Sequence, residues 1–82
     1  MIIIFKTEIG SIFTIDTDLL TFEKSGQHKA HGKLCHVPEI AIGKNPCLWL
    51  RDVGGIGYPM TLSKVVEVER VDRVRPDSVK SA

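Results

Sequence analysis

The chain has few cysteines, few aromatic residues and almost no net charge. Two cysteines, Cys35 and Cys47, stand among 82 residues, whereas a small secreted domain usually carries about four or more in a disulfide framework. We therefore expect reduced thiols and a cytoplasmic protein. Eleven Lys and Arg residues face ten Asp and Glu residues. This balance excludes a polybasic protein that binds its ligand through net charge alone.

Long apolar runs are also absent. The longest, residues 1–5, is far shorter than the roughly 20 residues that span a bilayer. No basic segment precedes it and no small-residue cleavage site follows it, so we expect neither a membrane segment nor a secretory signal. Leu, Ile, Val and Phe nevertheless number 26, enough for the core of one small domain.

The residues that are abundant predict an all-β fold. Val, Ile and Thr number 22, and the five aromatic residues fall one to each of five candidate strands; such side chains fit a pleated sheet better than a helix. Alternation with period two predicts strands at 2–8, 12–16, 20–24, 47–52, 58–62 and 65–71, and 34–37 fits a further short strand. The first three are separated by short turns and predict a three-stranded meander. The whole predicts a small antiparallel barrel or sandwich of about six short strands.

The remaining segments predict the loops and the domain bounds. Residues 25–33 are polar, contain two glycines and lack periodicity, which predicts a loop. Residues 38–42 fit either one short helical turn, with Pro38 at its first position, or extended chain. A helix over 62–75 is the rival to the last strand, but its many valines disfavour it. We expect a single β domain over 1–72 and a flexible C-terminal tail over 73–82.

Three histidines and two cysteines suggest a metal site. Zinc prefers a tetrahedron of such ligands, so one hypothesis is a zinc-stapled structural module that uses His28, His31, Cys35, His36 and Cys47. The spacing matches no established zinc motif, because both C-x-x-C pairs are missing. The ordinary alternative is that His28 and His31 are solvated loop residues, that His36 shares the inward face with Leu34, and that the thiols are small buried hydrophobes.

Catalytic groups are hard to find. Cys35 and His36 are neighbours on a candidate strand, so their side chains point to opposite faces and do not pair as thiolate and base. Residues 54–57 are rich in glycine, but Met60 stands where a dinucleotide loop needs its third glycine, and we interpret them as a turn. We expect no enzyme and no cofactor, since so small a core rarely spares a pocket.

The leading hypothesis is a non-catalytic interaction module that binds an unidentified protein partner or forms a homodimer. The first strand is apolar on both faces, which suggests cover on both sides, and Trp49 and Tyr58 could anchor a contact. The alternative is a nucleic-acid-binding small β-barrel. Residues 24–37 hold three lysines, three histidines and no carboxylate, and Lys29 and Lys33 would meet phosphates. Nucleic acid is not favoured, because the aromatic residues form no obvious base-stacking platform.

Overall fold

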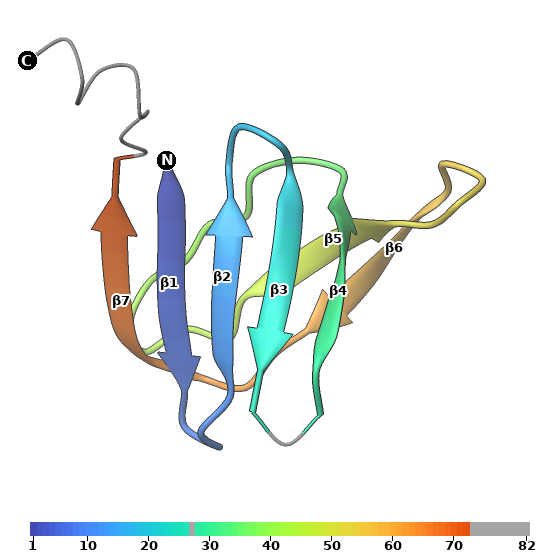
Figure 1. The fold of residues 1–82 in the computed structure, drawn as a ribbon. Helices are drawn as coiled ribbons and strands as arrows, with labels where there is room; N and C mark the ends of the chain where they lie inside the picture. Colours follow the sequence, from blue (N-terminus) through green and yellow to red (C-terminus); the bar gives the residue numbers. More distant parts are fainter. Residues whose placement is uncertain (27, 73–82) are drawn as a thin grey trace, which may run out of the picture.

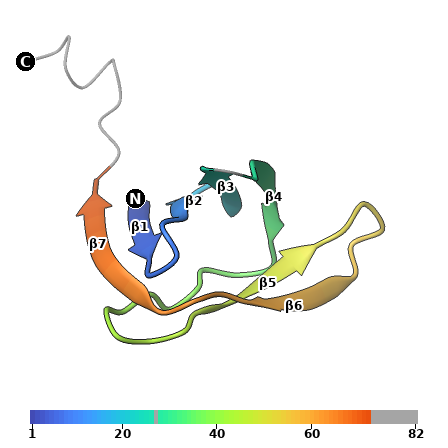
Figure 2. The same cartoon turned by 90° about the horizontal axis from the view of Figure 1, so that it is seen from below.

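The computed structural model describes residues 1–26 and 28–72, which form one curled sheet of seven antiparallel strands (Figure 1). The strands are β1 (Ile2–Thr7), β2 (Ile12–Asp16), β3 (Thr21–Ser25), β4 (Ala30–Leu34), β5 (Cys47–Arg51), β6 (Gly57–Thr61) and β7 (Val65–Val71). Their order in the sheet is β6-β5-β4-β3-β2-β1-β7. The sheet curls into a half-barrel (Figure 2), which confirms the all-β class and the opening meander. The predicted tail at 73–82 lies outside the described residues.

The core fills the inner face of the half-barrel. Phe5 and Phe13 lie directly opposite each other on β1 and β2, and their rings stack with centroids 5.1 Å apart. Ile2 and Ile4 point to the outer face of β1 and are only half-buried. We expected both faces of this strand to be covered. The inner face is fully covered, and the outer face is only partly covered. The buried apolar residues are Ile3, Phe5, Phe13, Ile15, Phe22, Leu34, Ile40, Leu48, Leu50 and Val65.

The predictions for 25–33 and 34–37 are wrong in part, because β4 begins at Ala30 and ends at Leu34. Only Leu34 of this strand is buried, so the strand shows no apolar alternation. The inward position before Leu34 is Gly32, which pairs with Phe22 of β3. A Cβ at Gly32 would lie 2.9 Å from the Phe22 ring. The glycine therefore makes room for a core aromatic ring and does not break the strand.

Gly32→Ala is expected to lower the free energy of unfolding by about 1–3 kcal/mol, because the buried Phe22 ring must shift. Thermal unfolding would register this as a fall of roughly 4–8 °C for each kcal/mol in a domain of this size. Gly54→Ala is the control, since a Cβ there would meet only Asp52 Oδ1 at 3.5 Å. Equal losses in the two variants would contradict the close contact with Phe22.

The helical alternative for residues 38–42 is also wrong. The residues that the structure describes contain no helix, and hence none that is long and apolar enough to cross a membrane. In this segment Pro38 and Ile40 are buried, whereas Glu39 and Ala41 are exposed. Over residues 38–41 this alternation is that of extended chain, and a turn with the exposed Ile42 follows it. The segment connects β4 to β5, and on its way it crosses the open side of the half-barrel (Figure 2).

Hydrogen bonds to β7 fix this crossing segment, residues 35–46. Gly43 N donates to Val65 O at 2.8 Å, and Val65 N donates to Lys44 O at 2.9 Å. Further along β7, the Arg70 guanidinium donates to the carbonyl oxygen of Ile40 at 2.6 Å. A loop with strand-like hydrogen bonds therefore closes the side of the half-barrel that the sheet leaves open.

Candidate functional site

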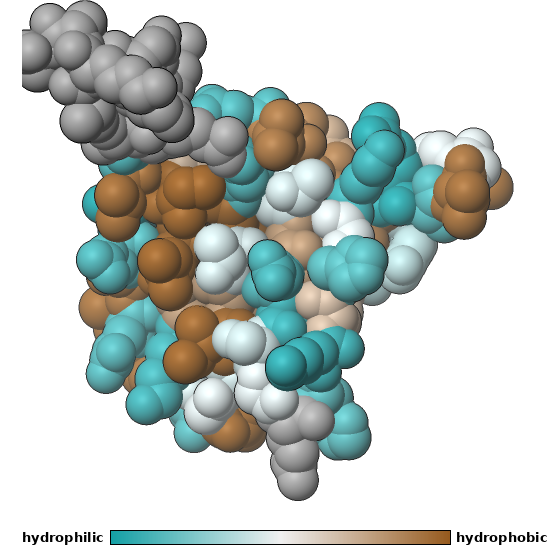
Figure 3. Space-filling view, viewed as in Figure 1, coloured by the Kyte–Doolittle hydropathy of each residue, from teal (hydrophilic) through white to brown (hydrophobic). Residues whose placement is uncertain are grey.

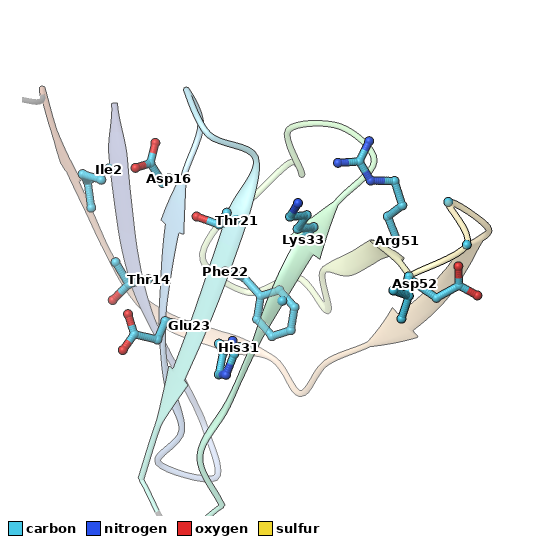
Figure 4. A pocket seen from close by; sticks show the side chains of 14 residues that line it. Ile2, Thr14, Asp16, Thr21, Phe22, Glu23, His31, Lys33, Arg51 and Asp52 are labelled. Atoms are coloured by element: carbon cyan, nitrogen blue, oxygen red, sulfur yellow. The ribbon is translucent and has the colours of Figure 1, made fainter.

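Two rows of side chains cross the outer face of the sheet. Directly paired residues of neighbouring strands share a face, so the register gives one row of Ile2, Asp16, Thr21, Lys33 and Arg51. The next row holds Thr14, Glu23 and His31. These side chains line a groove of about 1120 Å³ (Figure 4). We call it the outer groove.

The turn between β5 and β6 forms one wall of the outer groove, through residues 52–55. Asp52 organises this turn: its amide donates to Ile56 O at 3.0 Å, and its Oδ1 accepts from Ile56 N at 2.8 Å. Gly55 adopts a positive φ of 83°, which glycine tolerates without a steric penalty. The Asp52 carboxylate therefore stabilises the turn. Val53, at the tip of the turn, is fully exposed.

A second aspartate of the groove supports another turn. Asp16 Oδ1 accepts hydrogen bonds from the amides of Asp18, at 3.0 Å, and Leu19, at 3.1 Å, the geometry by which Asp stabilises a turn. Glu23, the third carboxylate in the lining, is exposed and stands opposite His31. Of the three acidic side chains, two are thus committed to the turns that shape the groove.

Two cations lie next to each other in the outer groove. Lys33 of β4 lies directly opposite Arg51 of β5, and like charges in this arrangement destabilise a strand pair. Both side chains are exposed, and neither forms an ion pair with the residues that the structure describes. Figure 4 shows both near the top of the groove. Two cations side by side, with no ion-pair partner among residues 1–26 and 28–72, form a site that an anion would stabilise.

The residues predicted for a partner site lie on different surfaces. Lys33 lines the groove, whereas Lys29 is exposed just before β4 and outside the lining. Trp49 and Tyr58 are 42% and 47% exposed. They point to opposite faces of the β5–β6 hairpin, because Tyr58 pairs with Leu50, whose side chain is buried inside, and Trp49 is the next residue before Leu50. They do not form one common anchor.

The five predicted metal ligands are similarly dispersed. His28 lies between β3 and β4, and His31 lies on β4, in the outer groove. Cys35 and His36 follow β4, and Cys47 begins β5. Both cysteines are free thiols and exposed, and His36 is exposed as well, so the expectation of buried thiols and an inward His36 is wrong. Cys35 Sγ donates to Leu50 O at 3.6 Å. Over residues 1–26 and 28–72, no three His, Cys, Asp or Glu side chains gather as a metal-binding group.

Sequence reasoning missed Arg51, Glu23 and the threonines of the groove. Alternation within β5 places Arg51 on the outer face, but its neighbour Lys33 follows only from strand order and register. Comparison of the chain with protein-family models, with curated proteins and with solved structures gives no match. The function is therefore inferred from the chain's own residues.

Proposed function

We propose that the chain is a non-catalytic binding module whose outer groove takes an extended acidic segment of a protein partner. The observation that carries this proposal is the position of Lys33 and Arg51, two exposed cations directly opposite each other without an ion-pair partner in the described part of the chain. A carboxylate seated between them would form charge-assisted hydrogen bonds with both. It would also remove the repulsion between them.

The shape and lining of the groove favour a peptide over a small molecule. The groove is open and extends from Ile2 on β1 to Val53 in the turn between β5 and β6, whereas a small-molecule pocket encloses most of its ligand. Ile2 and Val53 offer apolar surface, and Thr14 and Thr21 offer hydroxyl groups. A peptide strand presents side chains of both kinds in alternation.

The charges of the groove favour a peptide over nucleic acid. A bound nucleic-acid strand needs positive charge along its whole phosphate backbone. Here the cations gather near Lys33 and Arg51, while Glu23 and Asp16 line the part of the groove over β2 and β3. Both carboxylates would repel a phosphate. A peptide with its acidic residue near Arg51 and a neutral or basic residue near Glu23 avoids that repulsion.

The double variant Lys33→Glu/Arg51→Glu tests the groove. The probe is a fluorescent peptide with glutamates at one end and alternating threonine and lysine residues at the other, and its binding is followed by anisotropy. We expect the variant to bind at least about tenfold more weakly, which corresponds to about 1.4 kcal/mol, because it replaces attraction by repulsion. A mixed-sequence single-stranded oligonucleotide is titrated in parallel.

Lys44→Glu/Lys64→Glu is the matched control, because it makes the same change in net charge at two exposed lysines outside the groove lining. The control should bind the peptide as the unmodified chain does. Equal loss in the two double variants would show that net charge, and not the groove, determines binding. Binding of the oligonucleotide but not of the peptide would replace the proposal with nucleic-acid recognition.

A further inference from the structure

The neighbours of Lys33 and Arg51 across the sheet are uncharged. Lys33 of β4 and Arg51 of β5 lie directly opposite each other, and we call them the cation pair. In the same row, Thr21 of β3 lies opposite Lys33, and Gly57 of β6 lies opposite Arg51. Directly opposite side chains are the ones that approach most closely across strands. The row therefore places no carboxylate beside the cation pair.

The neighbours along the two strands carry no negative charge either. Residues two positions apart on a strand share a face. His31 stands two positions before Lys33, and Cys35 stands two positions after it. Trp49 stands two positions before Arg51. Within the part of the chain that the structure describes, the cation pair therefore has no acidic neighbour on these strands or directly across from them.

The nearest carboxylates of the outer groove lie further off. Asp52 follows Arg51 in the chain, but its Oδ1 accepts a hydrogen bond from Ile56 N at 2.8 Å. Figure 4 shows this carboxylate pointing away from Lys33. Glu23 lies in the next row, diagonal to Lys33 and about 7–8 Å from it at the backbone. Neither carboxylate forms an ion pair with the cation pair.

The charge of the cation pair matches that of a doubly charged anion. Lys33 and Arg51 each contribute one positive charge at neutral pH. A carboxylate brings one negative charge and leaves one cation uncompensated, whereas a phosphate monoester brings about 1.5–2 negative charges at pH 7. A phosphate therefore removes the repulsion between the two side chains more completely than a carboxylate does.

The donors of the cation pair also match a phosphate. An arginine guanidinium binds two oxygens of one anion through parallel N–H groups, and a lysine ammonium binds as a point charge. Arg51 would occupy both oxygens of a carboxylate, so that Lys33 would have to share one. A phosphate monoester has three acceptor oxygens, which leaves one for Lys33. The Cβ atoms of directly opposite residues lie about 4.5–5.5 Å apart, so both side chains reach one phosphate group.

The cation pair lies at the hydrophilic end of the outer face. Figure 3 shows apolar side chains gathered over β1 and hydrophilic ones over β3 and β4. Ile2, at the β1 end of the groove, is four strands away from Arg51. A phosphate at the exposed cation pair would therefore keep its outer side in water, and the rest of a bound peptide would extend toward Ile2.

We propose that the cation pair binds a phosphorylated threonine or serine on the extended segment of the protein partner. This inference rests on the proposed function, because it names the anion that the outer groove takes. It adds one requirement that the proposed function does not make: the groove must distinguish a phosphate from a carboxylate at the same position of the peptide.

Three fluorescent peptides test this requirement. All three carry alternating threonine and lysine residues at one end, and they differ in a single residue at the other end, which is phosphothreonine, glutamate or threonine. Binding to the full chain is followed by anisotropy at about pH 7.5, where the phosphate is mostly a dianion. We expect the phosphothreonine peptide to bind at least about tenfold more tightly than the glutamate peptide, and the threonine peptide to bind most weakly.

Single variants locate the phosphate on the chain. Lys33→Gln and Arg51→Gln each leave one cation, which a carboxylate compensates nearly as well as a phosphate does. The preference for phosphothreonine over glutamate should therefore fall at least about threefold in each variant. Lys64→Gln is the matched control, because it removes one charge at an exposed lysine outside the groove lining, and it should keep the preference. Circular dichroism verifies that all three variants fold.

The possible failures are distinguishable. Equal affinity for the phosphothreonine and glutamate peptides would overturn this inference and leave the proposed function standing, whereas the absence of binding by all three peptides would overturn both. A preference that persists in Lys33→Gln and Arg51→Gln would place the phosphate elsewhere on the chain. Inorganic phosphate that displaces the phosphothreonine peptide as effectively as unlabelled peptide does would assign the site to a free phosphate. Either of these two results would also overturn the inference.

Discussion

Phe5→Ala is expected to lower the free energy of unfolding by about 3–5 kcal/mol, through lost burial and the cavity that remains. The side chain is 1% exposed, and its ring stacks on Phe13 at 5.1 Å. A domain of 82 residues has a total stability of roughly 4–12 kcal/mol. The variant therefore loses a large part of that stability. Urea unfolding followed by circular dichroism measures the difference.

Tyr58→Ala is the control for this substitution, because it removes an aromatic ring that is 47% exposed on the edge strand β6. We expect a loss of about 1 kcal/mol or less, as for most exposed positions. Where Phe5→Ala does not fold, Phe5→Leu keeps most of the buried volume and gives a measurable, smaller loss. Similar losses for Phe5→Ala and Tyr58→Ala would contradict the assignment of the core to the inner face.

Strands with one buried face were predictable from the sequence, because alternation reports that face directly. The strands at 12–16 and 65–71 have the predicted bounds. Phe13 and Ile15 are buried, as their alternation with polar residues indicates. In the last strand, Val66 and Val68 alternate with Glu67 and Glu69, but Val66 is exposed and Val65 is buried in its place, because the register shifts at Lys6 and Thr7 of β1. β4 was not predictable in this way. The inward position before Leu34 is Gly32, and only the Phe22 ring on the neighbouring strand explains that glycine.

The candidate site depends on information that a single sequence does not carry. Lys33 was recognised as a basic residue, and alternation alone would place Arg51 on an outer face. Their position opposite each other depends on β5 pairing with β4 after the crossing segment, in one particular register. A shift by one residue would turn Arg51 into the core. The sequence therefore predicts the individual residues of the groove, but their arrangement side by side follows only from the register of the strands.

The crossing segment shows how tertiary hydrogen bonds override a local signal. Pro38 and Gly43 resemble the first and last positions of a helical turn. A single turn satisfies few of its own backbone groups, whereas β7 offers strand-like partners: Val65 bonds both Gly43 and Lys44. Extended chain also lets Ile40 reach the core. Both effects favour the observed conformation, and neither is visible without the position of β7.

Ile40→Ala is therefore expected to lower the free energy of unfolding by about 2–4 kcal/mol, although Ile40 lies in a loop. Its side chain is 3% exposed in the core. Ile42→Ala makes the same chemical change two residues away, where the side chain is 65% exposed, and should cost about 0.5 kcal/mol or less. Hydrogen exchange gives a second measurement: the Val65 amide, which donates to Lys44 O, should exchange faster in Ile40→Ala only. Equal losses for the two isoleucines, or unchanged exchange at Val65, would mean that residues 35–46 do not close the half-barrel.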